Sequence, residues 1–410
     1  MKILHTSDWH IGHKLYGNDR SDEHRLFFDW LLSTIRQQKI DVLLVCGDIF
    51  DIAYPSNQSL KTYYDLLKKL VKTDLRKLII IGGNHDSVTT LEAPREILEI
   101  LNVKVLGGVP DNIEDEIIEI NNDAGQTEVV IAATPFLRDR DVRTPQAGES
   151  APERITAIRQ GIVNHYHELA KLVESYKTQN IPVIASGHLF MQGAQLSESE
   201  RDIHIGNQAG VGADSFPAIF DYFALGHIHR AQSISHQPPI IYSGSPIALS
   251  YSERNHEKSV RLIHIEESGL KHEKLTIPQA RRLQSFEGTF AQLIEKVDAY
   301  SADSQLPDWI ELNIREENYD PLLARRISDF VEESNARESG FEIIRHTLIF
   351  ADQSSAGFIL PEAGKALADM SETEVFERLL EQQNVSDRDA LLDTYRELSE
   401  LVYSDESEGQ

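Results

Sequence analysis

The feature that most constrains this chain is a set of five short polar signatures, each of which lies just past the end of an apolar run. The signatures are Ser7-Asp8-Trp9-His10, Gly47-Asp48, Gly83-Asn84-His85-Asp86, Gly187-His188 and Gly226-His227-Ile228-His229. The preceding runs, which are short and apolar enough to form buried strands, are residues 2–4, 41–46, 77–81, 181–185 and 222–225. Ligands of open α/β sheets bind outside the carboxyl ends of the strands. We therefore expect the five signatures to converge on one cleft.

Length and composition limit the class of protein. The chain has 410 residues, which is too long for one compact core and indicates two or three domains. Cys46 is the only cysteine, so an intramolecular disulfide is excluded. No signal-peptide pattern follows Met1, and no apolar stretch approaches the length of a membrane span. We therefore expect a cytoplasmic protein without a membrane partner.

The formal net charge of −26 would ordinarily argue against a nucleic-acid partner, because phosphate binding uses clustered Lys and Arg. Much of this charge lies in residues 351–410, which hold 4 basic and 15 acidic residues. A metal cleft also supplies positive charge at the point where a phosphate binds. The charge therefore does not exclude nucleic acid.

The first 275 residues alternate strand-like and helix-like patterns, which predicts a sheet covered by helices on both faces. Apolar residues at helical spacing predict helices after Asp22 and over residues 60–71. Residues 152–177 are predicted to form a further helix after a loop over 138–150. Residues 278–350 combine an alternating strand pattern around Ile310, helical spacing over 322–331 and a strand-like segment over 341–350, which predicts a small α/β domain.

Residues 351–410 are predicted to form a linker and a helical tail. Two capping-box patterns, Ser371 with Glu374 and Ser386 with Asp389, precede two apolar stripes. Exposed stripes of this kind mark partner sites, so residues 371–402 are predicted to bind a partner. The alternative is that both helices pack back onto the preceding domain of the same chain.

The signatures contain the ligands of two metal ions. Asp8 and His10 are two residues apart at a strand end, where alternation directs both side chains the same way. The two oxygens of Asp48 can bridge two cations. The remaining donors are the amide oxygen of Asn84 and the imidazole nitrogens of His188, His227 and His229. Oxygen and nitrogen ligands without thiolate suit Mn²⁺, Fe or Zn²⁺ better than Ca²⁺.

A single Asp-x-His or Gly-His is more often a loop feature than a metal ligand. The presence of all five signatures at strand ends favours metal binding, because independent loop residues have no reason to supply a complete ligand set. Two cations roughly 3.5 to 4 Å apart activate a bridging water and stabilise both the attacking and the leaving oxygen of a phosphoryl transfer. The pattern therefore predicts phosphoester hydrolysis.

His85 directly follows the ligand Asn84 and is the best candidate for contacting phosphate or protonating the leaving oxygen. The alternative is that it only packs beside Asn84. Other histidines lack a matching context and are expected on the surface or in the core; these are His5, His13, His24, His165, His167 and His204.

The order of the five signatures resembles the calcineurin-like metallophosphoesterase superfamily. Within it, residues 1–12, 135–143 and 242–246 are similar to the bacterial branch of DNA nuclease subunits. The resemblance implies an α/β fold: a metallophosphoesterase β-sheet core flanked by helices over 1–277, a small α/β capping domain over 278–350, and the helical tail. It also implies two divalent metal ions, most typically Mn²⁺.

The family pattern carries over to this chain residue by residue. It places Asp8, His10, Asp48 and His229 around one metal, and Asp48, Asn84, His188 and His227 around the other, with His85 as the catalytic histidine. Archaeal and eukaryotic relatives have a second functional histidine shortly after Gly-Asp, where this chain has Phe50-Asp51. Asp51 is expected to orient a ligand or a water instead.

The resemblance further implies an ATP-dependent double-strand exonuclease and single-strand endonuclease of DNA ends and hairpins. The implied partner is an ATPase with a long coiled coil, in a heterotetramer that contains a homodimer of the nuclease. Two alternatives remain: a free-standing phosphodiesterase of small nucleotides, and a scaffold of the same fold that has lost its metals.

Overall fold

The computed structural model describes residues 1–146, 148–201, 203, 209–266, 269–318, 320–337 and 339–350, together with residues 380, 391, 392, 394 and 395. The predicted helical tail over 351–410 lies outside the described residues apart from those five, and so does His204. The prediction that residues 371–402 bind a partner therefore stays a prediction. In the described part of the chain, none of the helices has the length and hydropathy needed to cross a bilayer.

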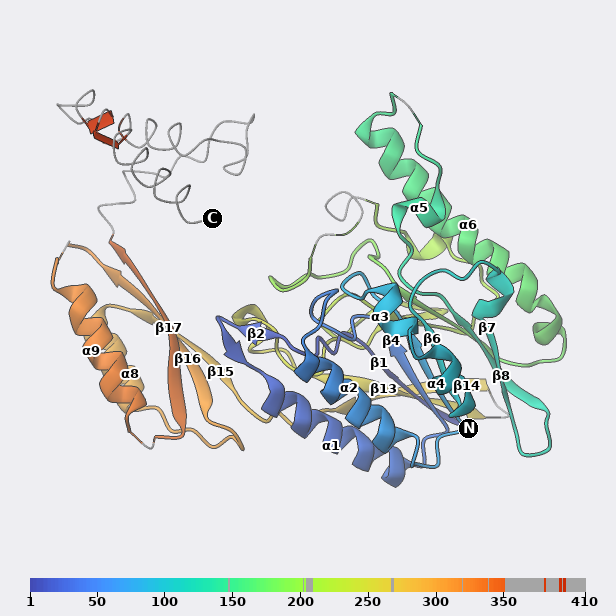
Figure 1. The fold of residues 1–410 in the computed structure, drawn as a ribbon, viewed down its shortest axis with the longest axis horizontal. Coiled ribbons are helices and arrows are strands. Elements are labelled where there is room, and N and C mark those ends of the chain that lie inside the picture. Colours follow the sequence, from blue (N-terminus) through green and yellow to red (C-terminus); the bar gives the residue numbers. More distant parts are fainter. Residues whose placement is uncertain are drawn as a thin grey trace, which may run out of the picture. The chain divides into compact units, whose positions relative to one another are not determined.

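The core contains two six-stranded sheets (Figure 1). The first has the order β14-β13-β1-β4-β5-β6 and consists of β1 (Lys2–Thr6), β4 (Val42–Cys46), β5 (Lys77–Ile81), β6 (Val103–Leu106), β13 (Ser259–Glu266) and β14 (Gly269–Thr276). The second has the order β11-β12-β10-β9-β8-β7 and consists of β7 (Ile117–Asn121), β8 (Thr127–Ala133), β9 (Val183–His188), β10 (Tyr222–Gly226), β11 (Gln232–His236) and β12 (Pro239–Tyr242). The strands that precede the five signatures are β1, β4, β5, β9 and β10, and within each sheet they run parallel to their neighbours in this set.

The core has two sheets and not one, so the expectation of a single sheet covered by helices on both faces is wrong. Side chains from both sheets share one buried cluster, in which Val42 and Ile79 of the first sheet lie with Ile184 and Ala224 of the second. One face of each sheet therefore packs against the other sheet, and only the opposite face is left for helices. A strand buried by a sheet and a strand buried by a helix have the same continuous apolar sequence, so the pattern could not separate them.

Helices cover the outer face of each sheet, and the predicted ones are confirmed. Against the first sheet pack α1 (Ser21–Gln38) and α2 (Asn57–Leu70), whose apolar residues join β1 and β4 in one cluster. Against the second packs the long α6 (Ala151–Thr178). Shorter helical elements are α3 (Val88–Glu92), α4 (Arg95–Ile100), α5 (Asp139–Val142), η1 (Ile113–Glu116), η2 (Ala213–Ser215) and η3 (Tyr251–Glu253), and a small hairpin joins β2 (Lys14–Leu15) to β3 (Asn18–Asp19). The segment 138–150, expected to be a loop, contains α5.

A separate three-stranded sheet has the order β15-β16-β17, with β15 (Leu283–Gly288), β16 (Asp308–Glu316) and β17 (Phe341–Phe350). Two helices accompany it in the sequence, α8 (Phe290–Asp298) and α9 (Leu323–Asn335). Phe290 and Phe330 pack edge to face with ring centroids 5.7 Å apart. The strand and helix patterns predicted between residues 308 and 350 are therefore confirmed.

Candidate metal centre

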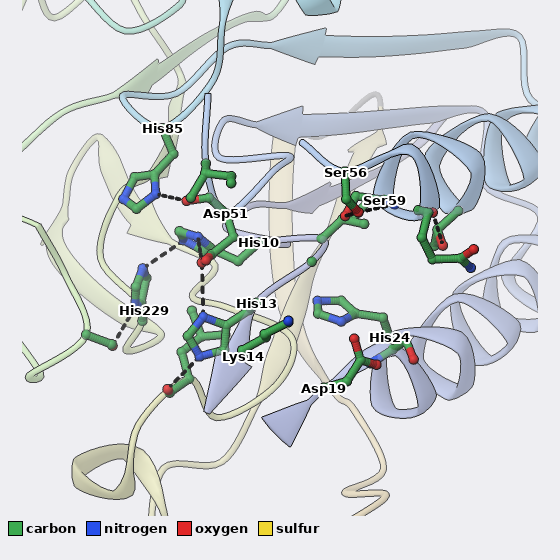
Figure 2. A pocket seen from close by; sticks show the side chains of 18 of the residues that line it. His10, His13, Lys14, Asp19, His24, Asp51, Ser56, Ser59, His85 and His229 are labelled. Atoms are coloured by element: carbon green, nitrogen blue, oxygen red, sulfur yellow. Dashed lines mark hydrogen bonds and ion pairs between the residues drawn. The ribbon is translucent and has the colours of Figure 1, made fainter. Parts of the chain in front are cut away.

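The structure brings the five polar signatures together at the carboxyl ends of strands from both sheets. Each proposed ligand other than Asn84 is buried. A cavity of about 680 Å³ opens beside them, and His10, His85 and His229 form part of its wall (Figure 2). The five signatures, which lie between residues 7 and 229, thus contribute to one site, as their strand-end positions predicted.

The backbone at four of these positions is in the left-handed region. Asp8, His10, Asp48 and His227 have φ values of 53°, 46°, 51° and 99°. Residues other than glycine adopt this conformation rarely and at a cost of about 1 to 3 kcal/mol. Such strain persists only where the surrounding structure enforces it, and its concentration at the ends of three strands points to a functional site.

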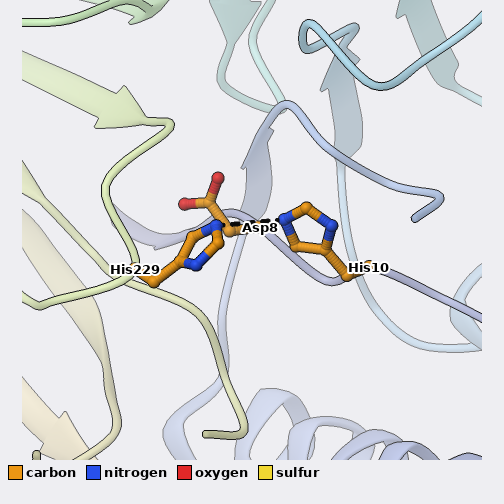
Figure 3. Close-up of side chains that lie close together, drawn as sticks. All are labelled: Asp8, His10 and His229. Atoms are coloured by element: carbon orange, nitrogen blue, oxygen red, sulfur yellow. Dashed lines mark hydrogen bonds between the residues drawn. The ribbon is translucent and has the colours of Figure 1, made fainter. Parts of the chain in front are cut away.

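One group of donors consists of Asp8, His10 and His229, whose ligand atoms all lie within 4.8 Å of one another (Figure 3). Nε2 of His10 and Nε2 of His229 are 3.2 Å apart. The carboxylate of Asp8 is fixed by the hydroxyl of Ser7, which donates over 2.5 Å, and by the backbone N–H of His227, which donates over 2.9 Å. These donors fit one divalent ion.

A second group consists of Asp8, Asp48 and His188, again within 4.8 Å. Nε2 of His188 lies 2.9 Å from Oδ1 of Asn84 and 3.3 Å from Oδ2 of Asp48. The same Asp48 oxygen is 3.6 Å from Nε2 of His10 in the first group. Asp48 therefore lies between the two groups.

Among the proposed ligands, His227 gives the clearest indication that a metal ion binds here. Its ring packs against that of His188 with centroids 5.4 Å apart, and it is 2% exposed. Its Nε2 is buried without a hydrogen-bond partner among the described residues. A buried imidazole nitrogen without a partner is costly, and a metal ion at this position would satisfy it.

Electrostatics keep His10 and His227 neutral, as ligands must be. Burial lowers the pKa of His10 to about 3 and is also the main cause that holds the pKa of His227 well below its usual value. Burial acts in the same direction on His188, but the charge and hydrogen bond of Asp48 outweigh it and raise the pKa of His188 to about 9. Burial would raise the pKa of Asp48, yet the charges of His188, His85 and His10 hold it well below the usual value.

His85 lies at the cavity wall and belongs to neither of these two groups. It forms a third set of neighbouring donors with His10 and Asp51. Its Nδ1 is 2.6 Å from the backbone oxygen of Asp51, and its Nε2 is 3.9 Å from Oδ2 of Asp48. Its backbone N–H donates to Oδ1 of Asp48 over 2.9 Å. With Nδ1 donating to a carbonyl, Nε2 is the ring nitrogen left for other partners.

Two further carboxylates support the site. Asp86 accepts backbone N–H groups from Gly83, Ile49 and Phe50 at 2.8, 3.1 and 3.0 Å, so it joins the loop after β5 to the loop after β4. Asp51, expected to orient a ligand or a water, has Oδ1 3.3 Å from Nδ1 of His10. Sequence reasoning gave Asp86 no role, although its place in the third signature was visible.

Gly226 of the fifth signature must be a glycine because the backbone of Cys46 lies very close to it. A Cβ at Gly226 would lie 1.8 Å from the carbonyl oxygen of Cys46. Cys46 ends β4 of the first sheet and Gly226 ends β10 of the second, so the two sheets meet here. The carbonyl of Cys46 also lies 3.0 Å from Nδ1 of His188, which leaves Nε2 of that ring for a metal.

The histidines outside the signatures differ in environment. His5 and His24 are buried with backbone oxygens as partners, and His167 is exposed, as expected of core and surface residues. His165 contacts Glu116 at 3.0 Å, away from the metal groups. His13 was expected to be unremarkable, but it lines the cavity with Nδ1 3.0 Å from Oδ1 of Asp51.

Arg20, which follows His10 in the sequence and directly precedes α1, is a buried structural cation. It is 2% exposed and donates to Glu23 over 2.7 Å and to the carbonyl of Ala248 over 2.8 Å. Lys14, which also follows His10 in the sequence, lines the cavity.

Comparison with known proteins agrees with the fold. The calcineurin-like phosphoesterase family matches residues 1–231, and the family described as type 5 capsule protein repressor C-terminal domain matches residues 279–384. The chain is 36% identical to the SbcD subunit of nuclease SbcCD from Escherichia coli K12 over 338 residues, which is 81% of this chain and 82% of that protein. It is 34% identical to the SbcD of Rhodobacter capsulatus, with 65% and 66% covered, and 31% identical to that of Bacillus subtilis, with 64% and 66% covered. The chain therefore belongs to the SbcD family of calcineurin-like phosphoesterases.

Proposed function

We propose that this chain is the metal-dependent nuclease subunit of an ATP-dependent DNA repair and recombination complex. It would act as a double-strand exonuclease and as a single-strand and hairpin endonuclease. The observation that carries the proposal is the convergence of carboxylate, amide and imidazole donors from five strand ends on one cavity. The names of the relatives, which call them nuclease subunits, support the same reading.

Two divalent ions, most typically Mn²⁺, would occupy the two donor groups. Asp8, His10, Asp48 and His229 would hold one ion, and Asp48, Asn84, His188 and His227 the other. The mixed oxygen and nitrogen donors and the unpartnered Nε2 of His227 support this assignment. Such a pair of ions, when bound, supplies an activated water and charge stabilisation for phosphodiester hydrolysis.

The protein's own residues provide orientation and a proton. Asp48 holds the backbone of His85 in place through the N–H of that residue. The hydrogen bond from Nδ1 of His85 to the Asp51 carbonyl directs Nε2 toward the site, where it would protonate the leaving oxygen.

The shape of the cavity supports a polymeric substrate. The same cavity is also lined by Lys14, Ser56 and Ser59 (Figure 2). Thr62 lines it as well. A cation and several hydroxyl groups beyond the metal groups suit the phosphates of neighbouring nucleotides. A small nucleotide would have no need of this extension.

We further propose that the chain works with an SbcC-type partner, as the names of its relatives suggest. This partner would be an ATPase that has a coiled coil. The substrates would be DNA ends and hairpins, and the assembly would be a heterotetramer that contains a homodimer of this chain in the cytoplasm. The domain boundaries expected from the sequence, at residues 277 and 350, belong to the same proposal.

The experiment compares full-length protein and two variants on a hairpin DNA, a single-stranded DNA and a small chromogenic phosphodiester, each with Mn²⁺ and with or without the ATPase. Asp48→Asn alters the shared ligand, and Glu116→Gln is a matched control because Glu116 is equally buried but contacts Thr134 and His165. We expect Mn²⁺-dependent DNA cleavage by the parent protein and the control, and its loss in Asp48→Asn together with weaker metal binding.

Two outcomes would contradict the proposal. Turnover of the small phosphodiester with intact hairpin and single-stranded DNA would indicate a free-standing phosphodiesterase. No cleavage and no Mn²⁺ binding by the folded parent protein would indicate a scaffold of the same fold.

A further inference from the structure

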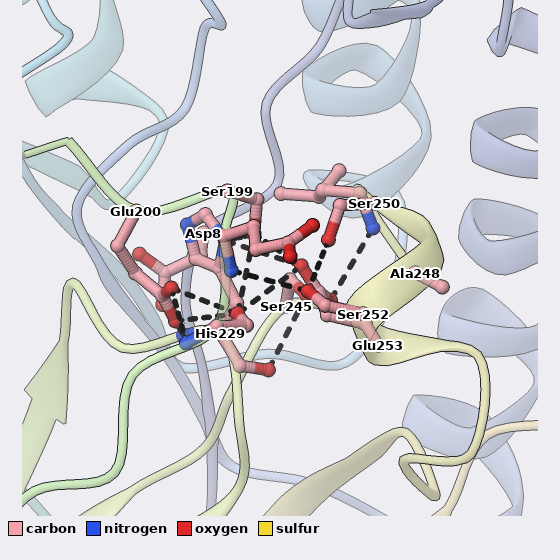
Figure 4. A network of polar contacts seen from close by, with 12 residues as sticks. Asp8, Ser199, Glu200, His229, Ser245, Ala248, Ser250, Ser252 and Glu253 are labelled. Carbon is pink, nitrogen blue, oxygen red and sulfur yellow. Dashed lines mark hydrogen bonds and ion pairs between the residues drawn. The ribbon is translucent and has the colours of Figure 1, made fainter. Parts of the chain in front are cut away.

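A buried ion pair that belongs to neither metal group contacts His229 at Nδ1 and at its backbone carbonyl, and not at the Nε2 that faces His10. Glu253, at the end of η3, is 0% exposed, and Lys258 is 9% exposed. The two side chains form a hydrogen-bonded ion pair. Figure 4 shows the polar network around Glu253, Ser199 and His229.

The contacts on the imidazole of His229 specify which nitrogen carries its proton. The hydroxyl of Ser199 donates to Oε1 of Glu253, because a carboxylate can only accept. Its oxygen is therefore the acceptor toward Nδ1 of His229, 2.6 Å away. Oε1 of Glu253 itself lies 3.5 Å from the same nitrogen. Nδ1 is thus the protonated nitrogen, and the lone pair is on Nε2.

The backbone of His229 is held by the same network. Nζ of Lys258 donates to the carbonyl oxygen of His229 over 3.2 Å and to Oγ of Ser245 over 2.8 Å. Oε1 of Glu200 accepts the backbone N–H of His229 over 2.8 Å. Ring, N–H and carbonyl are therefore fixed together, and Nε2 is directed toward Nε2 of His10.

Stability alone does not explain a charged pair at this place. Desolvating two charges costs about as much as their attraction returns, and apolar residues of similar volume often serve a core as well or better. A ligand histidine, by contrast, needs an acceptor at its second ring nitrogen, and changing such a partner typically costs about 10-fold to 100-fold in metal affinity.

We propose that Glu253 and Lys258 are a positioning pair that fixes the tautomer and orientation of His229 for metal binding, with Ser199 as the link. This inference rests on the proposed two-metal site and adds to it the residues that prepare one half. Glu253 and Lys258 touch no substrate, so they are positioning residues and not catalytic ones. Metal affinity should depend on this pair at the donor group that contains His229. It should not depend on the pair at the group that contains His188, because the ring of His188 is oriented by the Cys46 carbonyl.

The test measures Mn²⁺ binding to the full-length chain by calorimetry and by electron paramagnetic resonance, which counts free ions. Glu253→Gln keeps the size of the side chain but removes its charge, and Glu116→Gln is the matched control, since that buried carboxylate also contacts a histidine. We expect Glu253→Gln to bind one of two Mn²⁺ ions at least about 10-fold more weakly, with the other unchanged. The control should bind both ions as the parent does, even if it melts at a lower temperature.

A second variant protects the test against failure of Glu253→Gln to fold. Ser199→Ala removes only the hydroxyl link, and we expect the same one-site weakening at smaller size. Wild-type affinity at both sites in a folded Glu253→Gln or Ser199→Ala protein would overturn the inference alone. Absence of Mn²⁺ binding by the parent protein would overturn the proposed function and the inference with it.

Discussion

The carboxylate of Asp48 faces the imidazole of His188 across the junction of the two sheets, with Oδ2 3.3 Å from Nε2. Asp48 follows β4 of the first sheet, and His188 ends β9 of the second. Without a metal the two behave as an ion pair, in which Asp48 raises the pKa of His188 to about 9 and His188 helps to hold the pKa of Asp48 low. A metal ion must replace the proton on His188 before both residues can bind it.

Metal binding should therefore release a proton and strengthen as the pH rises. The pKa of His188 is raised from its usual value of 6.5 to about 9. Its charged form therefore contributes its full stabilisation of the metal-free fold below about pH 6.5. This contribution is lost as the pH rises through about 9. Mn²⁺ affinity should increase by up to about 10-fold per pH unit over the same interval. Calorimetry in buffers of different ionisation enthalpy measures the released proton. A flat affinity from about pH 7 to about pH 8.5, without proton release, would contradict the assignment.

His85→Ala should lower phosphodiester cleavage by roughly 100-fold or more while leaving Mn²⁺ binding largely intact, because the variant loses a proton donor and no proposed ligand. Initial rates on single-stranded DNA and Mn²⁺ titrations are measured on the same preparation. His165→Ala is the control, since that ring contacts Glu116 and no proposed ligand. If His85→Ala lost Mn²⁺ as badly as Asp48→Asn, His85 would be a ligand and the division of roles would be wrong.

Arg20→Met should destabilise the fold without affecting cleavage per folded molecule. Its guanidinium is buried against Glu23, and breaking a buried pair costs about 3 to 5 kcal/mol. We expect about 3 kcal/mol, because Glu23 keeps Arg281 at 2.8 Å. The control is Arg25→Met, whose pair with Asp22 is exposed, so it should cost less than about 1 kcal/mol. Urea unfolding compares the two variants. A sharp drop in DNA affinity with unchanged stability would contradict the structural role and make Arg20 a phosphate contact.

The site could be predicted from the sequence far better than the architecture that surrounds it. Asp8, Asp48 and His188 are recognisable because five such signatures occur near strand ends in one chain, and strand ends converge by topology. The pairing of the strands into two sheets could not be predicted, since apolar strands do not specify whether a helix or a second sheet covers them.

The supporting residues were the hardest to predict. Glu253 follows no strand and has no sequence pattern of its own, and its link to His229 depends on a hydroxyl from the loop that holds Ser199. Arg20 is a second case, because its position shortly after His10 in the sequence does not show that its side chain is buried. Both cases depend on tertiary contacts that local spacing does not encode.

The sequence of residues 371–402 gives a prediction about the partner. Replacing Phe376 and Leu379 with Asp in the full-length chain should abolish copurification with the ATPase and ATP-stimulated digestion of duplex ends, because both residues belong to one apolar stripe. Metal-dependent cleavage of single-stranded DNA should persist. Glu377→Ala with Glu381→Ala is the control on the polar side. Undiminished partner binding, or aggregation of the double variant, would favour packing of these residues onto their own chain.

The most direct measurement is anomalous scattering at the manganese edge from crystals of the full-length protein soaked in Mn²⁺. The two donor groups predict two peaks, with Asp48 in contact with both, His10 and His229 at one, and His188 and His227 at the other. Crystals with Mn²⁺ bound elsewhere, or with Asp48 remote from both His188 and His229, would contradict the account.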